Sequence, residues 1–478
     1  MPTISTATNQ QIESLVSQYR YSISNPVTIL KNRQTSLNAR TTVLSDLKSK
    51  LNALNTLAKD MKKTGTTSKF STYAFESSLS SVVTGAATST ASAGTHSLLV
   101  TQLAKADKVI SSQMTSSATT IAATEGAGSK RISLTVNGST VNVDFSIADG
   151  DSNSTVLSSM ATAINASSAS VTASVVSDTS GTSRLVFTSK SSGSAQAVSM
   201  ADVTGTVLNS IGLGASVISG RTGSTATEGG YLFASTSLLD SKFKLDGIDI
   251  VRGSNSVSDV LTGITLELKG VQLPTDTPVT LTVSSDKSAI KSTIQEFITK
   301  YNDALSYLTS KTSVNPDNKT REILASDQVF KTLRINMRTI IASSVTSVTA
   351  GNPTLLAEIG IKTNSDGTLT LSDTTKFDEA LASNVTKIAD LFNSSNGLAG
   401  QLNTLIESFT ASGGQIQIAQ DGASNQLANI TTSLTRTNAQ IDLKVASFRK
   451  QYESLYSAMT RISLQSQSIN SLLTQLYG

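Results

Sequence analysis

The sequence predicts an α+β chain of several domains, in which heptad-spaced terminal helices and a helical leg domain flank two antiparallel β-rich domains. Three observations carry this prediction. Apolar residues recur at steps of three and four near both ends of the 478-residue chain, which is the spacing of a helix with a narrow apolar face. Apolar and polar residues alternate between about 70 and 285, the pattern of half-buried strands. From 286 onward the helical spacing returns.

The N-terminal helices come first. Pro26, with Asn25 as the predicted N-cap, separates a short helix from a long one over about 26–63. Arg33 and Arg40 stand at seam positions of the long helix and predict a weaker apolar seam there. A helix with so narrow a seam gains little by standing alone, so it needs a partner. The predicted seam residues of the long helix are Leu37, Leu44, Leu47, Leu51 and Leu54.

The C-terminal end carries a matching seam. Heptads of this length are typical of a coiled coil, so the two ends are predicted to pair with each other. The alternative is that each end packs separately on the central domains. The predicted C-terminal seam residues are Val445, Phe448, Tyr452, Leu455, Met459, Ile462, Ile469, Leu473 and Leu476.

The middle of the chain is predicted to form β structure. In RISLTVNGSTVNVDF, two alternating runs flank Asn137-Gly138, which favours a type I′ hairpin turn. FKLDGIDIV repeats this design with Asp246-Gly247, and GITLELKG and PVTLTVSS are further strands. STVLSSMATAINASS predicts a helix between hairpins, and the Gly-rich segment 215–230 predicts a linker.

Helical stripes follow from 286. One stripe runs from Ile290 to Leu308, and a second from Phe330 to Ile340. The run GIKTNSDGTLTLS predicts a hairpin, with Asp366-Gly367 at its turn. Two more stripes, over about 377–392 and 398–409, complete the leg domain.

Charge and composition exclude several classes of function. The net charge is +4, but residues 26–63 carry +6 and 427–478 carry +3, which leaves the residues between them acidic. The basic ends are either a solvated helix face or a surface for an acidic partner. Nucleic acid is a poor partner because few aromatic residues accompany these charges. No segment approaches the ~18 consecutive apolar residues of a membrane span, and the N-terminus lacks the pattern of a cleavable secretion signal.

The residues that catalysis or metal binding needs are scarce. The chain has no Cys and a single His, so it lacks a zinc ligand set. His96 lies in a predicted strand with no nucleophile elbow nearby, so we expect no enzyme, no cofactor and no metal. The absence of Cys also suits an extracellular structural protein without a reactive thiol.

Several stretches, in order, resemble the flagellar filament cap family, also called hook-associated protein 2. The most specific is LAEIGIKTNSDGTLTLSDTTKFDEALASNVTKIADLFN, at 356–393. The others are SAGTHSLLVTQLAKADKVIS, GSNSVSDVLTGITLELKG, TLTVSSDKSAIKSTIQEFITKYND and ILASDQVFKTLRINMRTII. The resemblance spans nearly the whole chain, although the N-terminal ATNQQIES departs from the family's Gly-rich opening.

This resemblance implies a homo-oligomeric plate or ring at the distal tip of the bacterial flagellar filament. Helical legs reach the filament end, and arriving flagellin is held until it joins the lattice. Export by the flagellar type III route needs no cleavable signal peptide, and a cytoplasmic export chaperone commonly holds the C-terminal region. The alternative function is a tip adhesin that binds host glycans or surfaces.

The resemblance also implies a domain map. The predicted domains are a terminal coiled coil of 1–40 with 440–478, a helical leg of 41–70 with 286–439, an inner β plate domain of 71–110 with 231–285, and an outer inserted β domain of 111–230.

Overall fold

The computed structural model describes residues 6–315, 320–383 and 385–477. The chain forms two compact units. The residues up to Phe70 and those from Lys287 onward form the helical unit, and Ser71–Asp286 form the β unit. This division lies within one residue of the predicted changes at 70/71 and 285/286, and the predicted fold class is confirmed. The finer predicted division of the helical unit into coil and leg stays a prediction.

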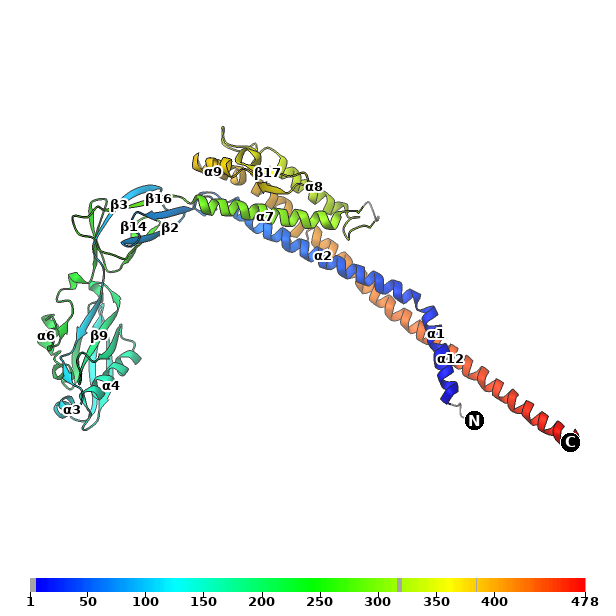
Figure 1. Cartoon of the computed structure of the whole chain (residues 1–478), viewed down its shortest axis with the longest axis horizontal. Helices are drawn as coiled ribbons and strands as arrows, with labels where there is room; N and C mark the ends of the chain where they lie inside the picture. Colours follow the sequence, from blue (N-terminus) through cyan, green and yellow to red (C-terminus); the bar gives the residue numbers. More distant parts are fainter. Residues whose placement is uncertain (1–5, 316–319, 384, 478) are drawn as a thin grey trace. The chain divides into compact units, whose positions relative to one another are not determined.

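The helical unit is built from long helices and one small hairpin (Figure 1). The hairpin consists of β17 (Ile361–Thr363) and β18 (Leu369–Leu371). Short 3₁₀ turns lie at η1 (Gly65–Thr67) and η4 (Leu356–Ile359). The helices are α1 (Thr6–Ile23), α2 (Asn25–Met61), α7 (Lys287–Thr312), α8 (Gln328–Ala342), α9 (Thr374–Ser383), α10 (Val385–Asn393), α11 (Leu398–Thr410) and α12 (Gln415–Tyr477).

The start of α2 differs slightly from the prediction. Ser24 separates α1 from α2. It occupies the N-cap position that the sequence predicts for Asn25. Pro26 lies in the first turn of α2, where its missing N–H costs no helical hydrogen bond. The predicted division of one long helix from a short one therefore holds, displaced by one residue.

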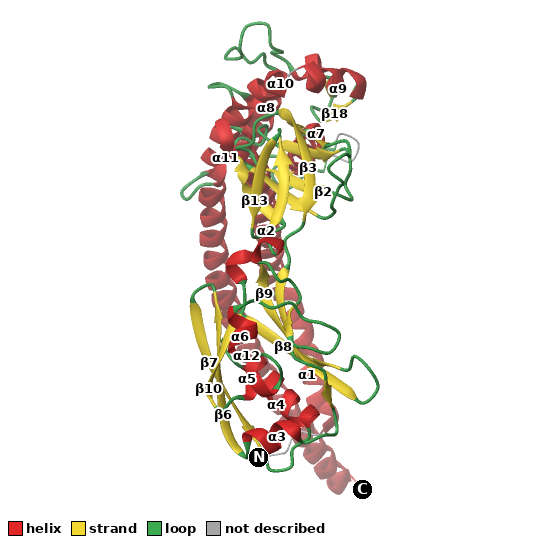
Figure 2. Ribbon diagram, turned by 90° about the vertical axis from the view of Figure 1, so that its left-hand side faces the viewer, coloured by secondary structure: helices red, strands yellow, loops and turns green. Residues whose placement is uncertain are grey.

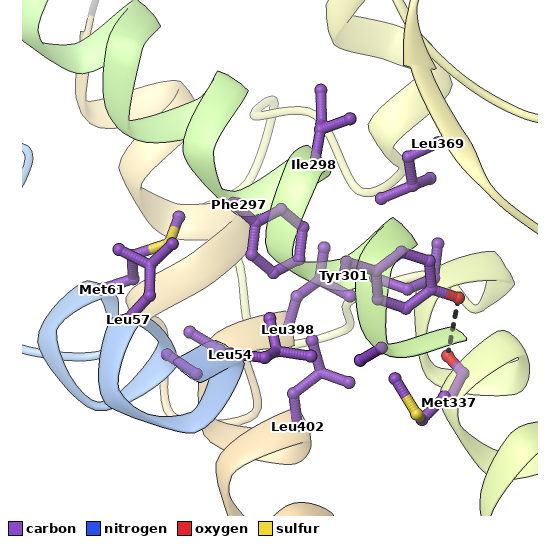
Figure 3. Close-up of a cluster of buried hydrophobic side chains, with 14 of the residues drawn as sticks. Leu54, Leu57, Met61, Phe297, Ile298, Tyr301, Met337, Leu369, Leu398 and Leu402 are labelled. Carbon is purple, nitrogen blue, oxygen red and sulfur yellow. Dashed lines mark hydrogen bonds between the residues drawn. The ribbon is translucent and has the colours of Figure 1, made fainter. Parts of the chain in front are cut away.

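The core of the helical unit joins α2, α7, α8 and α11 (Figure 3). Leu54 and Met61 of α2 face the ring of Phe297 on α7. Tyr301 is fully buried beside them, and its hydroxyl donates a hydrogen bond to the carbonyl oxygen of Met337 at 3.5 Å. With no Trp in the chain, this core depends on Phe, Tyr and Leu packed from non-adjacent helices.

The inner part of the β unit packs two antiparallel sheets around one core. One sheet has the order β1-β16-β3-β12-β13, and the other β14-β15-β2. Asp246-Gly247 forms the turn between β12 and β13, as predicted. The strands are β1 (Tyr73–Ser77), β2 (Val83–Ala87), β3 (Gly94–Gln102), β12 (Ser241–Leu245), β13 (Ile248–Arg252), β14 (Ser256–Leu261), β15 (Ile264–Leu268) and β16 (Val279–Ser285), and η3 (Thr236–Leu238) precedes β12.

The outer part of the β unit has its own core under α4. Figure 2 shows β7, β10 and β6 side by side, in the sheet order β10-β6-β7. The second sheet has the order β11-β4-β9-β5, with β8 paired to β9. The strands are β4 (Ala106–Ile110), β5 (Met114–Thr115), β6 (Gly128–Val136), β7 (Ser139–Ile147), β8 (Val171–Val176), β9 (Thr182–Ser192), β10 (Ser199–Thr204) and β11 (Gly230–Tyr231). The helices are α3 (Thr120–Glu125), α4 (Asn153–Ala166), η2 (Ser194–Gln196), α5 (Val207–Ser210) and α6 (Ala215–Ser219).

The predicted outer boundaries at 111 and 230 cut through this sheet. β4 pairs with β9, and Val109 of β4 is fully buried in the outer core. Tyr231 belongs to the same core. Residues 106–110 therefore lie with the outer part and not, as predicted, with the inner plate domain. A strand that ends one domain and begins another carries the same alternation in both, so the pattern alone misplaces it.

The predicted linker over 215–230 is wrong, because this segment is packed against the outer core. Arg221 lies at a φ of 45° and pairs with the fully buried carboxylate of Asp107 at 2.6 Å. The Arg221 guanidinium also lies 4.1 Å from the ring centre of Tyr231. Arg184 donates hydrogen bonds to the carbonyl oxygens of Thr225, Ala226 and Glu228. These contacts hold a Gly-rich segment that composition alone marks as a linker.

Candidate functional site

The second half of α2 lies inside the helical unit. Leu44, Leu47, Leu51 and Leu54 have no exposed surface and belong to the core shared with α7, α8 and α11. A buried amide pair fixes α2 against α11, because Asn403 Nδ2 donates to Asn55 Oδ1 at 2.8 Å. A shift of either helix would leave these amides buried without partners, which is costly. These four seam residues therefore serve the chain's own core.

The first half of α2 pairs with α12, whose ribbons run side by side in Figure 1. Leu37 of α2 is buried against Ala423 and Ile430 of α12. Partly buried Leu30, Leu427 and Leu434 extend this contact. The N-terminal and C-terminal heptads thus pair within one chain, as the sequence predicts, rather than packing separately.

The short helix α1 continues the pairing further along α12. Ile12 and Val16 of α1 are buried. The ring of Tyr19 stacks on Phe448, with 4.3 Å between ring centres. Two ion pairs flank the rings, Arg20 with Asp442 at 2.7 Å and Glu13 with Arg449 at 2.6 Å. The predicted seam residues Val445, Phe448 and Tyr452 are half-buried in this region.

From Ser457 to Gln475, the side chains of α12 are exposed apart from half-buried Thr460, and the helix extends past the end of its pairing with α1 (Figure 1). We call five of its apolar side chains, each between 47% and 65% exposed, the exposed stripe. The predicted seam includes all five, whereas Leu464 and Leu472, which are also exposed, are not among its residues. The predicted seam residue Leu476 lies outside the residues whose side chains the structure describes. The exposed stripe consists of Leu455, Met459, Ile462, Ile469 and Leu473.

Arg40 has a different role from the one its seam position predicts. Both of its terminal nitrogens bind the carboxylate of Asp327, at 2.7 and 2.9 Å. Asp327 is the N-cap residue of α8. A bidentate, partly buried pair of this kind holds two helices in register. Arg40 therefore anchors α2 to α8, and the weaker apolar seam at this position stays a prediction.

Among the described residues, no catalytic arrangement of side chains surrounds His96. His96 lies on β3, and its Nδ1 is 2.7 Å from Oδ2 of Asp246 in the turn between β12 and β13. The hydroxyl of Ser97 reaches Asp246 at 3.5 Å. A serine triad needs the hydroxyl against the imidazole, and here it faces the carboxylate instead. Within the described residues, no group of three or more His, Cys, Asp or Glu could hold a metal ion, and no helix is long and apolar enough to cross a membrane.

Acidification should weaken the end of the β12–β13 hairpin. The hydrogen bond from His96, then that from the Ser97 amide, lowers the pKa of Asp246 below its ordinary value. A carboxyl of this kind contributes stability that is present above its unfolded-state pKa of about 3.9 and is lost as pH falls through the lower folded-state value.

We therefore expect Asp246→Asn to lower the free energy of unfolding at neutral pH by no more than ~1 kcal/mol, because the carboxyl is half exposed. Asn tolerates the positive φ of 52° at this position, so the turn itself should persist. The difference from wild type should shrink towards pH ~3. Urea unfolding of both proteins at the two pH values measures this, and a constant difference would contradict a role for the ionised carboxylate.

Comparison with known proteins links this architecture to one family. Residues 8–107 match the sequence model described as flagellar hook-associated protein 2 N-terminus, and residues 239–463 match that of its C-terminus. The chain is 31% identical over 354 residues to the A-type flagellar hook-associated protein 2 of Pseudomonas aeruginosa, which covers 71% of this chain and 70% of that relative. It is 32% identical over 193 residues to the flagellar hook-associated protein 2 of Salmonella typhimurium, covering 38% and 39% of the two chains.

A solved structure shows the same fold. The D1-D2-D3 domains of the flagellar cap protein FliD from Escherichia coli superimpose with a TM-score of 0.60 at 25% sequence identity. The match covers 80% of this chain and 99% of that one.

Proposed function

The chain belongs to the flagellar hook-associated protein 2 family, and from this premise we infer that it is a structural cap protein of the bacterial flagellar filament. A cap at the distal tip promotes the incorporation of arriving flagellin and prevents its leakage. The observation that supports this function most directly is the exposed stripe of α12, an apolar helix face without a partner in the described chain.

We propose that the exposed stripe binds the filament end. Side chains of this size gain about 1.5–3 kcal/mol each when they become fully buried. The half-buried residues Val445, Phe448 and Tyr452 lie where α12 pairs with α1 of its own chain, and the stripe that would face the filament begins beyond them. Such a division would let a subunit change its hold on the filament without unfolding its own core.

The partners and the route out of the cell follow from the same proposal. Several copies of the chain would form the plate or ring, with flagellin and filament-end subunits as the other contacts. Before export, a cytoplasmic type III chaperone would cover the exposed stripe, since a bare apolar face invites aggregation. The chain would then leave by the flagellar type III route to the extracellular tip.

We further propose that this function involves no covalent chemistry. The arrangement of His96, Ser97 and Asp246 supports this, because it ties the hairpin together and presents no nucleophile to the imidazole. The alternative of a tip adhesin gains no support from the relatives or from the matching structure, whose names describe hook-associated and cap proteins.

Replacing Leu473 by Asp tests the stripe. Leu473 is 47% exposed, so the isolated protein should keep the melting temperature of wild type. At the filament end, however, burying a carboxylate in an apolar contact is strongly unfavourable. Cells with this variant should release monomeric flagellin into the medium and swim poorly, as measured by immunoblot of the medium and by motility in soft agar.

Ser471→Asp is the matched control. Ser471 lies two residues from both Ile469 and Leu473, on the opposite side of the helix. The Ser471→Asp variant adds the same charge close to the same helix end but leaves the exposed stripe intact. Cells with this variant should therefore swim normally. Secretion of both variants is checked first, because the chaperone is expected to bind this region. Full motility with exported Leu473→Asp protein would refute the interface role of the stripe.

A further inference from the structure

The chain contains two Asn–Gly pairs, and the structure places them in opposite environments. Asn137-Gly138 forms the turn between β6 and β7 in the outer part of the β unit. Asn396-Gly397 precedes α11 in the helical unit. The two pairs share one local chemistry and differ only in their surroundings, so each serves as a control for the other.

The turn at Asn137 is open. Val136 pairs with Ser139, which leaves Asn137 and Gly138 alone at the tip, both exposed and with φ values of 49° and 73°. Within the described residues, the Gly138 amide donates no hydrogen bond and the Asn137 side chain makes none. No atom outside the adjoining residues lies within 4 Å of the place where a Gly138 side chain would begin. No contact from outside the turn therefore hinders rotation of this peptide unit.

The pair at Asn396 is held from several sides. The Gly397 amide donates to the carbonyl oxygen of Ser394 at 2.9 Å, and the Asn396 amide to the hydroxyl of Ser347 at 2.9 Å. Gly397 is buried, and a side chain there would clash with the carbonyl oxygen of Phe392. Gly397 also occupies the N-cap of α11, so its backbone is fixed by the helix that follows.

We propose that Asn137 is a site of spontaneous deamidation and that Asn396 is not. The deprotonated amide nitrogen of Gly138 attacks the side-chain carbonyl carbon of Asn137. A C–N bond forms, the side-chain nitrogen leaves as ammonia, and a five-membered cyclic imide results. Water then opens the ring at either carbonyl, which yields aspartate or isoaspartate and returns a proton to the Gly138 nitrogen. No oxidant or cofactor enters the balance, and water is the sole co-reactant.

The reaction requires what the turn offers. The attacking nitrogen must be free of hydrogen bonds, and the Gly138 amide is. The peptide must also rotate towards the side chain, which the absence of Cβ at Gly138 and the empty space around it permit. At Asn396 the corresponding nitrogen is occupied and the backbone is fixed.

Deamidation would change the hairpin in two ways. Either product adds one negative charge at the tip of an already acidic unit. Isoaspartate also routes the main chain through the former side chain, which lengthens the turn by one carbon. A two-residue type I′ turn matches the twist of its strands only at its normal length. The pairing of Val136 with Ser139 and the contact between the Thr135 and Thr140 hydroxyls at 2.8 Å should therefore open.

Incubation of the purified full chain at mildly alkaline pH, followed by peptide mapping with mass spectrometry, tests this proposal. The denatured chain, incubated in parallel, gives the rate of each pair without structure. We expect Asn137 in the folded chain to gain the mass of an exchanged amide several-fold faster than Asn396, and the two to react at similar rates in the denatured chain. The rate at Asn137 should rise with pH, because the attacking amide must lose its proton.

Asn137→Gly is the matched variant, since Gly accepts the positive φ of the turn and has no side-chain amide. It should keep the hairpin and lose the product that wild type accumulates in the peptide beginning at Ile132. Equal rates at the two pairs in the folded chain would overturn the proposal. So would an unmodified Asn137 in folded protein over a period that converts it in the denatured chain.

Discussion

Replacing Leu51 by Ala is expected to lower the melting temperature of the helical unit by roughly 5–15 °C, because truncating a buried Leu typically costs about 2–5 kcal/mol. Leu51 has no exposed surface and lies in the core that α2 shares with α7 and α11. That core includes the fully buried Phe297 and Tyr301, whose rigid rings limit how far the core can close around a lost side chain. The cost should therefore lie in the upper part of this range.

Differential scanning calorimetry measures this effect and can separate the two units. The transition of the helical unit should move, whereas that of the β unit should stay. Leu443→Ala is the control, because it removes the same atoms from a helical residue that is 72% exposed. A melting temperature of Leu51→Ala equal to that of wild type would refute the core assignment of Leu51.

The second large effect is expected at Asp107. Its carboxylate is fully buried and accepts hydrogen bonds from two Arg221 nitrogens, at 2.6 and 3.1 Å, and from the Val198 amide at 2.8 Å. Asp107→Ala leaves the guanidinium and the amide without this partner in the interior. Breaking a buried pair from one side costs about 3–5 kcal/mol, so the β unit should lose a large part of its stability.

A paired variant separates the charge from the packing. Asp107→Leu combined with Arg221→Met removes both charges, and such apolar replacements are often neutral or stabilising. Urea unfolding of the single and double variants should therefore show a large loss for Asp107→Ala and a smaller one for the double variant. If Asp107→Ala matches wild type, the pair does not hold the segment 215–230.

Local patterns in the sequence were sufficient for some features and insufficient for others. Asn137-Gly138 specifies its hairpin because the turn and both strands lie within twenty consecutive residues. The pair of Asp107 with Arg221 joins positions 114 residues apart, in a segment whose composition resembles a linker. No local pattern records such a partner, and for the same reason the sequence places residues 106–110 in the wrong domain.

The candidate site shows the same limit. Spacing of three and four predicts an apolar helix face at Leu51 and at Leu473 alike, yet the first is buried and the second exposed. What differs is whether another helix reaches that position, and the spacing on one helix contains no information about the length of its neighbours. The bidentate contact of Arg40 with Asp327 is similarly set by where α8 begins.

The length of α12 gives the cap subunit a long reach. At 1.5 Å per residue, its 63 residues make a rod of about 95 Å, and the part beyond Tyr452 supplies roughly 38 Å of it. A force applied at the far end of a rod acts about the nearest fixed support. In α12 this support is the stacked ring pair of Tyr19 and Phe448. A bend of a few degrees at that support therefore moves the tip by several ångströms, while the packed end of the helix stays in place. On the proposal that the exposed stripe binds the filament end, a force applied near the tip would act on that contact through a long lever arm.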